Sequence, residues 1–244
     1  MKAAVLYGQQ DIRYEEVDTP KIDNEEILIK VQRSGICGSD IPRVLGKGAH
    51  YYPIILGHEF SGEVVEIGKS IKRVSVGDRI AGAPLLPCHQ CLDCLQGDYA
   101  QCKNYSFIGS RENGSWAQFV KIPEKNIVIL PAEATFEQGV FFEPLTVALH
   151  GIFLMDFKGG AEVAIIGMGT IGLLTLQCAR NLGAKRITVF DIDDERLGTA
   201  KEYGADLCLN TGDESFREIV LNETKGRGFE MVIDTAGVHF PQKL

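Results

Sequence analysis

A glycine-rich turn at residues 167–172 restricts the second half of the chain to very few folds. Residues 161–167 form a short apolar run typical of a buried strand, and residues 170–184 predict a helix that Gly183 ends. The turn between them, GMGTIG, matches G-x-G-x-x-G. In a strand–turn–helix context this motif indicates a dinucleotide site, although alone it would more often mark only a turn.

Each glycine of the turn has a separate use. Gly167 would permit the tight turn, Gly169 would let the backbone approach a pyrophosphate, and Gly172 would let strand and helix pack closely. Thr170 and Ile171 begin the helix, whose N-terminal amides and dipole favour an anion. We therefore expect the pyrophosphate of a dinucleotide at this turn.

An aspartate at the expected distance supports the same site. Asp191 lies nineteen residues after Gly172, where a carboxylate can bond a ribose 2′-hydroxyl. The neighbouring acidic residues would repel a 2′-phosphate, so the sequence favours NAD over NADP. Arg196, in the helix that follows, completes the predicted cofactor-binding set.

The strand and helix pattern divides the chain into two domains. After residue 160, strands at 161–167, 186–191, 207–210 and 229–237 alternate with helices at 170–184, 193–204 and 215–224. This alternation predicts a doubly wound parallel sheet. Earlier, short strands predict a mostly β half, at 27–32, 61–68, 76–82 and 117–123. Residues 137–156 read as helix, with Pro144 indicating a break or a helix start. We therefore predict a first domain at residues 1–157 and a second at residues 158–244. The fold class of the whole chain is α/β.

Composition and charge exclude several classes of partner. The 244 residues are 45% hydrophobic and 24% charged, with a formal net charge of -8 and no basic cluster, which argues against nucleic acid. Neither a signal peptide nor a membrane-spanning apolar run is present. We therefore expect a cytoplasmic protein, in which seven cysteines would serve as metal ligands or reactive thiols rather than disulfides.

Four cysteines lie within fifteen residues, spaced C-x2-C-x2-C-x7-C: Cys88, Cys91, Cys94 and Cys102. Two-residue gaps let turns direct successive thiolates at one tetrahedral ion, and the longer gap lets a loop return with the fourth. A redox C-x-x-C pair would explain only two of them. Four thiolates leave no vacancy for substrate, so we predict a structural zinc. Cys178 and Cys208 lie in apolar runs and are expected to be inert.

Two glycine-flanked turns, SGICGSD and LGHEFSG, carry the possible zinc ligands Cys37 and His58. Taken alone, each of these residues is weak evidence for a metal site. Together with the four cysteines, SVGDRIAG and the glycine turn, they make the chain resemble the zinc-dependent medium-chain alcohol and polyol dehydrogenases over essentially its whole length. The resemblance implies an N-terminal GroES-like, mostly β catalytic domain and an incomplete Rossmann domain. It also implies that the chain stops before the C-terminal part of the family fold.

The resemblance assigns site residues position by position. Cys37, His58 and Glu143 match the ligands of a catalytic zinc, giving two zinc ions per chain, and Glu59 matches the carboxylate beside the metal. Ser39 matches the proton-relay hydroxyl. From the residues alone, Glu143 could equally be an acidic helix-start residue, and Ser39 could cap a helix.

Longer strings, such as GAHYYPIILGHEFSG and FFEPLTVALHG, resemble the hexitol-phosphate branch of the sorbitol dehydrogenase group. This implies NAD-dependent oxidation of galactitol 1-phosphate to tagatose 6-phosphate by a homodimer or homotetramer. Sorbitol, threonine or a butanediol are alternative substrates, and a non-catalytic zinc-binding fragment is another alternative. The substrate phosphate would be held by one or two of Arg43, Lys47, His50 and Arg111.

Overall fold

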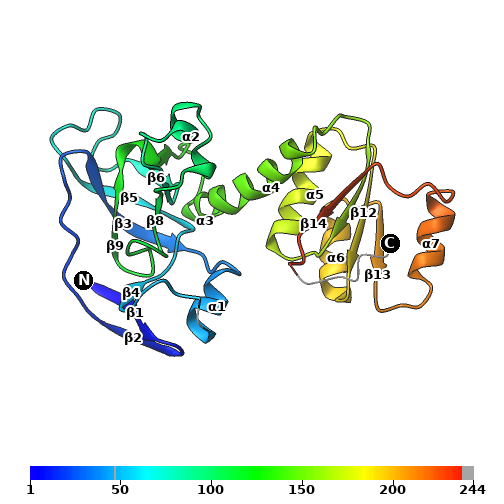
Figure 1. Ribbon diagram of the computed structural model, residues 1–244, viewed down its shortest axis with the longest axis horizontal. Helices are drawn as coiled ribbons and strands as arrows, with labels where there is room; N and C mark the ends of the chain where they lie inside the picture. The colour runs from blue at the N-terminus through cyan, green and yellow to red at the C-terminus, as the bar shows by residue number, and fades with distance from the viewer. Residues whose placement is uncertain (47, 238–244) are drawn as a thin grey trace. The chain divides into compact units, whose positions relative to one another are not determined.

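The structure, a computed structural model, describes residues 1–46 and 48–237. Contacts between Cα atoms divide the chain into two compact units, the first ending at Glu143 and the second beginning at Pro144. Antiparallel strands and short helices build the first unit, and a parallel sheet with longer helices builds the second (Figure 1). The predicted fold class, a mostly β half followed by a doubly wound α/β half, is confirmed.

Five antiparallel strands form the main sheet of the first unit, in the order β10-β6-β5-β3-β9. Alternating apolar side chains bury one face, where Ile29 and Phe60 pack with Ile122. The strands are β3 (Glu26–Ser34), β5 (Phe60–Ile67), β6 (Arg79–Gly82), β9 (Phe119–Pro123) and β10 (Ile127–Ile129). Ser34 lies opposite Phe60, so the chain leaves β3 and enters β5 at the same end of the sheet.

Smaller elements complete the first unit. A three-stranded sheet has the order β2-β1-β4, and β7 pairs with β8. These strands are β1 (Lys2–Gly8), β2 (Asp11–Glu16), β4 (Ile54–Ile55), β7 (Leu85–Leu86) and β8 (Ser106–Phe107). The helices are α1 (Asp40–Leu45), α2 (Leu92–Leu95) and α3 (Phe136–Val140), with 3-10 turns η1 (Tyr99–Gln101) and η2 (Glu124–Asn126). Both α1 and α2 follow cysteine-bearing loops, which places thiols at helix starts.

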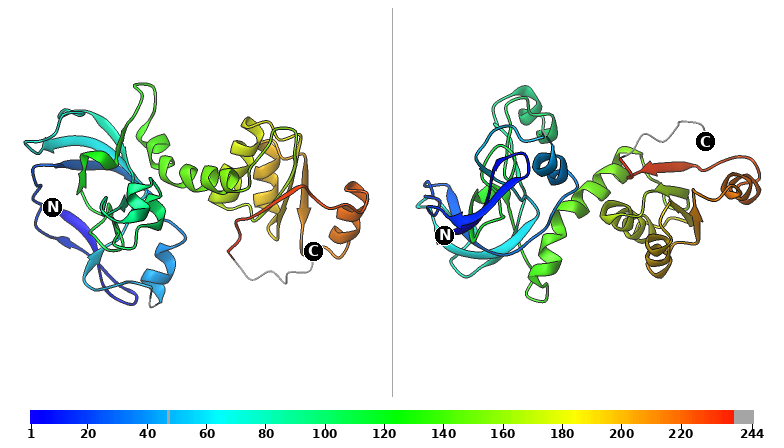
Figure 2. Two further views of the ribbon diagram at one scale, coloured as in Figure 1. Left: turned by 45° about the horizontal axis from the view of Figure 1, so that its top comes forward. Right: turned by 90° about the horizontal axis from the view of Figure 1, so that it is seen from below.

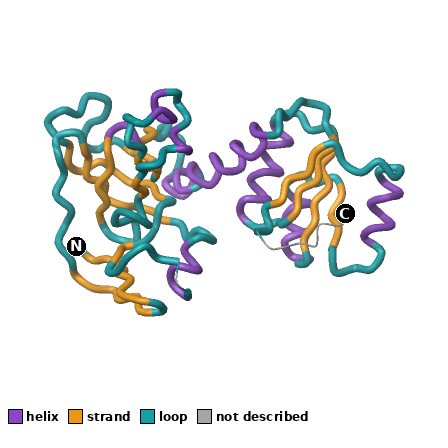
Figure 3. The backbone as a smooth tube through the Cα atoms, in the orientation of Figure 1, coloured by secondary structure: helices purple, strands orange, loops and turns teal. Residues whose placement is uncertain are grey.

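The second unit is a parallel sheet in the order β13-β12-β11-β14, with helices on both faces (Figures 1–3). Val163 and Ile165 pack with α5 and α6, whereas Ala164 and Ile166 pack with α7 on the opposite face. The strands are β11 (Glu162–Ile166), β12 (Arg186–Asp191), β13 (Leu207–Asn210) and β14 (Met231–Asp234). The helices are α4 (Phe142–Leu154), α5 (Thr170–Asn181), α6 (Asp194–Glu202) and α7 (Phe216–Glu223).

The division between the units lies earlier than the boundary expected after residue 157. Residues 137–156 form two helices, α3 and α4, rather than one. Pro144 is the third residue of α4, where its missing N–H costs no helical hydrogen bond, so the break that it predicted is present. Ala148 and Ile152 of α4 are buried in the core of the parallel sheet. This packing assigns most of α4 to the second unit.

Within the described ranges, none of the helices has the length and apolar character that a membrane span requires.

Candidate metal and cofactor sites

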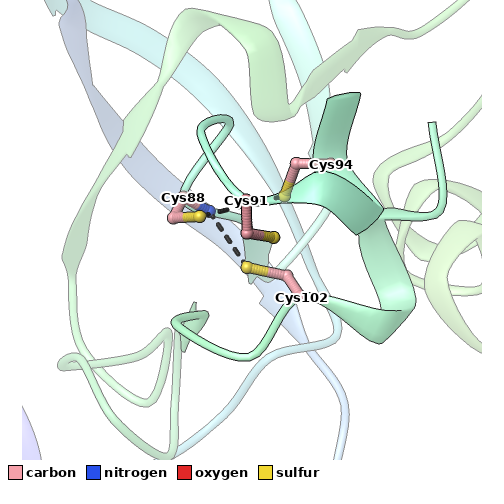
Figure 4. A group of neighbouring side chains, drawn as sticks. All are labelled: Cys88, Cys91, Cys94 and Cys102. Atoms are coloured by element: carbon pink, nitrogen blue, oxygen red, sulfur yellow. Dashed lines mark hydrogen bonds between the residues drawn. The ribbon is translucent and has the colours of Figure 1, made fainter. Parts of the chain in front are cut away.

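The four clustered cysteines converge on one point (Figure 4). Their sulfur atoms all lie within 4.8 Å of one another, and the sulfurs of Cys88 and Cys94 are 4.0 Å apart. Zn–S bonds of about 2.3 Å would separate two sulfurs of a tetrahedral site by about 3.8 Å. All seven cysteines, each in the described part of the chain, are free thiols rather than disulfides. The set therefore fits a closed tetrathiolate zinc site.

Local turns bring the four thiols together. His89 has a positive φ of 57°, which turns the chain sharply after Cys88, and Cys91 takes the N-cap position of α2. The 3-10 turn η1 then returns the chain to Cys102, whose sulfur accepts the backbone N–H of Cys88 at 3.3 Å. The predicted geometry of two short gaps and one return loop is present.

Polar and apolar surroundings affect the four thiols differently. Backbone N–H groups of Gln90 and Cys91 lower the pKa of Cys88 to about 6, because they stabilise its thiolate. Burial raises the pKa of Cys94 to about 12, and the neighbouring thiols add to the effect. Without a cation, the site would hold fewer than four thiolates. A divalent metal would offset this cost.

A second cluster forms where β3 ends and β5 begins. Ligand atoms of Cys37, His58 and Glu59 all lie within 4.8 Å of one another. The N–H of Gly35 donates to the carbonyl of Glu59 at 2.7 Å, which holds the two segments side by side. The imidazole of His58 is 4% exposed and packs edge-on against Phe107, with ring centroids 5.6 Å apart. The sheet register thus brings Cys37 together with His58, which lies 21 positions later in the sequence.

Asp40 faces His58 inside this cluster. Its Oδ1 lies 3.6 Å from His58 Nδ1, and neither atom has a hydrogen-bond partner although both are buried. The other oxygen, Oδ2, accepts the backbone N–H of Cys37 at 3.0 Å. Since Nδ1 faces a carboxylate, Nε2 is the nitrogen left for a metal, as in many carboxylate–histidine–metal arrangements. Neither the motifs nor the family resemblance assigned a role to Asp40; its spacing of three from Cys37 was the available signal.

Glu143 stands at the start of α4, the last residue of the first unit. It does not join the 4.8 Å group among the described residues, yet the charges of His58, Glu59 and Asp40 all influence it. Burial raises the pKa of Glu143, as it does for Glu59 and Asp40, and His58 partly offsets each rise. One buried carboxyl, from Asp40, and two half-buried ones, from Glu59 and Glu143, form with one thiol and one imidazole a donor set that favours a bound cation.

Ser39 takes the N-cap position of α1 but makes no side-chain capping hydrogen bond. Instead its Oγ accepts from Nη1 of Arg43 at 2.8 Å. The capping alternative is therefore wrong for this hydroxyl, because the arginine one turn later holds it.

The four candidate phosphate ligands have different surroundings. Arg43 is engaged with Ser39, and its side chain is only 18% exposed. Arg111 is exposed and lies over the ring of Tyr105, 4.4 Å from its centroid, while His50 is exposed after α1. Lys47 lies outside the described residues. Among the described candidates, Arg111 and His50 are accessible to an anion.

The glycine turn lies between β11 and α5 as predicted. A cavity of about 230 Å³ opens at the carboxyl ends of the parallel strands, lined among others by Gly167, Gly169, Asp191 and Arg196. A Cβ on Gly172 would stand 1.8 Å from the carbonyl oxygen of Gly167, so only glycine permits this strand–helix contact. No side chain caps α5, which leaves the amides of its first turn, from Thr170 and Ile171 onward, available to an anion.

Asp191 is held firmly at the end of β12. Its carboxylate accepts the N–H groups of Met168 at 2.6 Å, Ile192 at 2.8 Å and Asp193 at 3.1 Å. Arg196 lies 3.9 Å from the same carboxylate. Thr211 was not predicted from the sequence. Its buried Oγ1 has no hydrogen-bond partner, and the residue lines this cavity. Its position just after β13, at the carboxyl edge of the sheet, was the available signal.

Comparison with known families gives two matches. Residues 23–132 match the Alcohol dehydrogenase GroES-like domain, and residues 170–243 match the Zinc-binding dehydrogenase family.

Individual relatives support the same conclusion. The chain is 43% identical over 241 residues to galactitol 1-phosphate 5-dehydrogenase of Escherichia coli (strain K12), which covers 98% of this chain and 69% of the relative. It is 33% identical to sorbitol dehydrogenase of Bacillus subtilis (strain 168), covering 97% of this chain and 69% of the relative.

Solved structures agree. A crystal structure of galactitol-1-phosphate dehydrogenase from Escherichia coli superposes with a TM-score of 0.92, at 43% identity, over 97% of this chain and 69% of that one. An alcohol dehydrogenase from Escherichia coli CFT073, solved with NADH, gives a TM-score of 0.90 at 30% identity, over 97% of this chain and 69% of that one.

Proposed function

The chain belongs to the family of zinc-dependent alcohol and polyol dehydrogenases, and we propose that it oxidises galactitol 1-phosphate to tagatose 6-phosphate with NAD. The observation that carries the proposal is the group formed by Cys37, His58 and Glu59, whose ligand atoms lie within 4.8 Å of one another, with the buried carboxyl of Asp40 beside His58. The 43% identity to a galactitol 1-phosphate 5-dehydrogenase supports this choice of substrate.

Cys37, His58 and Glu143 would hold the catalytic zinc, with Glu59 beside it. When bound there, zinc supplies Lewis-acid polarisation of the alcohol oxygen, which lowers the pKa of the hydroxyl. Asp40 would fix the ring of His58 with Nε2 toward the metal, because Nδ1 faces its carboxylate at 3.6 Å. Cys88, Cys91, Cys94 and Cys102 would hold a second, structural zinc that takes no part in the reaction.

Ser39 would move the proton of the alcohol. Its Oγ can receive that proton while its own proton passes to a neighbouring acceptor or to water. The hydroxyl is exposed two residues from Cys37, which suits a group that exchanges protons with solvent. This transfer leaves the substrate oxygen deprotonated and its carbon ready to release hydride.

The cofactor would lie over the glycine turn of the second unit. When bound, its nicotinamide accepts the hydride. Amides of the first turn of α5 would bind the pyrophosphate, and Asp191, pinned by three N–H groups, would present its carboxylate to the ribose. Acidic Asp193 and Asp194 nearby would repel a 2′-phosphate, which supports NAD over NADP.

Arg111 and His50 would bind the phosphate of the substrate. Arg111 is the stronger candidate, because an arginine can form paired hydrogen bonds to phosphate. The backbone N–H of Arg111 donates to the carbonyl of Phe107 at 2.8 Å, and Phe107 packs on His58, so the turn that carries Arg111 lies next to a candidate zinc ligand. Arg111→Ala should raise KM for galactitol 1-phosphate about tenfold or more and leave KM for sorbitol within twofold. An equal effect on both substrates would remove the phosphate role.

A substrate panel tests the proposed function. NADH formation from NAD is measured with galactitol 1-phosphate, sorbitol, threonine and 2,3-butanediol as substrates. We expect kcat/KM to be at least tenfold higher for galactitol 1-phosphate. A preference for another alcohol would reassign the substrate within the family. No NADH with any of them, together with no increase in melting temperature on adding NAD, would favour the non-catalytic fragment. The cytoplasmic location and the homodimer or homotetramer stay predictions.

A further inference from the structure

Arg43 folds back along α1 onto the residue that begins it. Its Nη1 donates to the backbone carbonyl of Ser39 at 2.6 Å and to Oγ of the same residue at 2.8 Å. The side chain of Arg43 is 18% exposed, whereas Ser39 itself is an exposed residue. The hydroxyl of Ser39 is thus held by a permanent cation rather than left to rotate in solvent.

The direction of this hydrogen bond restricts what the hydroxyl can do. A guanidinium has five N–H donors and no acceptor, so Ser39 can only accept from Arg43. A hydroxyl offers one proton and two lone pairs, and Arg43 occupies one lone pair. One lone pair and one proton remain, which allows one proton to arrive and one to leave.

The same guanidinium also lies beside the buried carboxyl of Asp40. Nη1 of Arg43 is 3.6 Å from Oδ1 of Asp40, and that oxygen is 3.6 Å from Nδ1 of His58. Asp40 is 1% exposed, so a nearby positive charge offsets part of the cost of burying its carboxylate. Arg43 therefore connects the candidate relay hydroxyl with the carboxylate that faces the candidate zinc ligand.

We propose that Arg43 is a positioning residue for proton transfer, acting through Ser39 rather than on the substrate. This inference rests on the proposed function, because it needs Ser39 to carry the proton of an alcohol. In that transfer the substrate O–H bond breaks and a new O–H bond forms at Oγ, while the original Ser39 proton leaves to an acceptor or to water. Arg43 fixes the oxygen, which keeps one lone pair to receive a proton and one O–H to release a proton. No proton or electron passes to Arg43.

A double-mutant cycle tests this role. Variants Arg43→Ala, Ser39→Ala and the double variant are compared for kcat and KM with galactitol 1-phosphate and NAD. We expect Arg43→Ala to lower kcat about tenfold to 100-fold, with KM within twofold, because misplacement of a reacting group costs about that much. In the Ser39→Ala background, Arg43→Ala should lower kcat less than threefold, since the hydroxyl through which Arg43 acts is gone.

Two kinetic results would overturn the proposal. Equal losses in both backgrounds would mean that Arg43 does not act through Ser39. A rise in KM for galactitol 1-phosphate but not for sorbitol would assign Arg43 to the substrate phosphate instead. Arg13→Ala is the matched control, because it removes an exposed arginine paired with an aspartate on β2, and kcat should stay within twofold. If Arg43→Ala fails to fold, Arg43→Lys enters the same cycle, since an ammonium lacks the planar fork of donors.

Hydrogen–deuterium exchange gives a readout that needs no turnover. In the zinc-loaded chain, Arg43→Ala should speed exchange in residues 37–43 at least threefold and leave the zinc content equal to that of the unsubstituted chain. Unchanged exchange, or loss of zinc, would contradict a role confined to holding Ser39. Absence of NADH formation by the unsubstituted chain would instead count against the proposed function, and the exchange measurement would still decide whether Arg43 holds this loop.

Discussion

The carboxylate of Glu59 lies directly over the Cα of Gly35. A methyl group on Gly35 would stand 2.1 Å from Oε2 of Glu59 and 3.1 Å from its Cβ. The backbones of the same two residues are joined by the 2.7 Å hydrogen bond from the N–H of Gly35 to the carbonyl of Glu59. The orientation of Glu59 in the candidate catalytic cluster therefore requires glycine at position 35, because any larger residue would occupy the space of this carboxylate.

Gly35→Ala should displace Glu59 with little damage to the fold. The clash is with the flexible side chain of Glu59, so this carboxylate must adopt another rotamer. We expect kcat/KM for the alcohol to fall about tenfold or more, while stability to urea changes by about 1 kcal/mol or less. Gly38→Ala is the control, because a Cβ there meets no atom within 4 Å. Similar losses in both variants would show that the Gly35–Glu59 contact is unimportant.

Cys91→Ser should remove one zinc per chain. A tetrathiolate site that loses one thiolate binds zinc much more weakly. The loop around α2 would then lose the metal ion that cross-links it. We expect atomic emission to show one zinc instead of two, with a melting temperature lower by roughly 5–10 °C, equivalent to about 2–3 kcal/mol. Cys208→Ala, in a strand of the other unit, should keep both ions. A catalytic defect at full zinc content and unchanged stability would contradict the structural role.

Two neighbouring glycines should respond differently to alanine. A Cβ on Gly169 meets no atom within 4 Å, so Gly169→Ala should fold normally, yet its methyl group would stand where the pyrophosphate approaches. We expect its Kd for NADH to rise about tenfold or more at an unchanged melting temperature. Gly172→Ala should instead destabilise the second unit by roughly 1–3 kcal/mol, through contact with Gly167. Calorimetry for binding and for unfolding separates the two effects.

The ionised carboxylate of Asp206 should stabilise the second unit near neutral pH, and this stabilisation should be lost in acid. Burial opposes its charge, but the N–H of Ile187 and the guanidinium of Arg180 outweigh burial and hold the pKa of Asp206 below its usual value. A lowered folded-state pKa contributes stability above the unfolded pKa of about 3.9, and the contribution is lost as the pH falls further. Asp206→Asn should therefore cost about 1 kcal/mol at pH 5–7, because water screens this partly exposed pair.

Urea unfolding of both proteins measures that difference across pH. It should be constant between pH 5 and 7 and shrink below about pH 4. A difference that grows on acidification would contradict the assigned direction of the pKa shift.

Local patterns were enough to predict much of the fold. Apolar runs bounded by glycine, such as residues 161–167, have few competing structures, and β11 forms within that range. Periodicity predicted one helix at 137–156, but it could not show that the chain breaks at Phe141 and forms two helices. The division between the units depended on packing, because Ala148 and Ile152 of α4 are buried against the parallel sheet.

The candidate sites divide in the same way. Spacing alone predicted that Cys88, Cys91, Cys94 and Cys102 converge, because short turns fix how far apart neighbouring thiols can be. Position offered only a weak signal for Asp40 and Thr211, since their importance comes from buried atoms without hydrogen-bond partners, which only packing creates.

The sequence by itself determined the elements whose geometry is local: the tetrathiolate loop, the glycine turn and the alternation of strands and helices. Only the tertiary structure decided which distant residues meet. The antiparallel register of β3 and β5 places Cys37 beside His58, and the packing of the loop before α1 places Asp40 against the same histidine. A register depends on the packing of the whole sheet, and side-chain contacts depend on burial, so neither can be read from residue spacing.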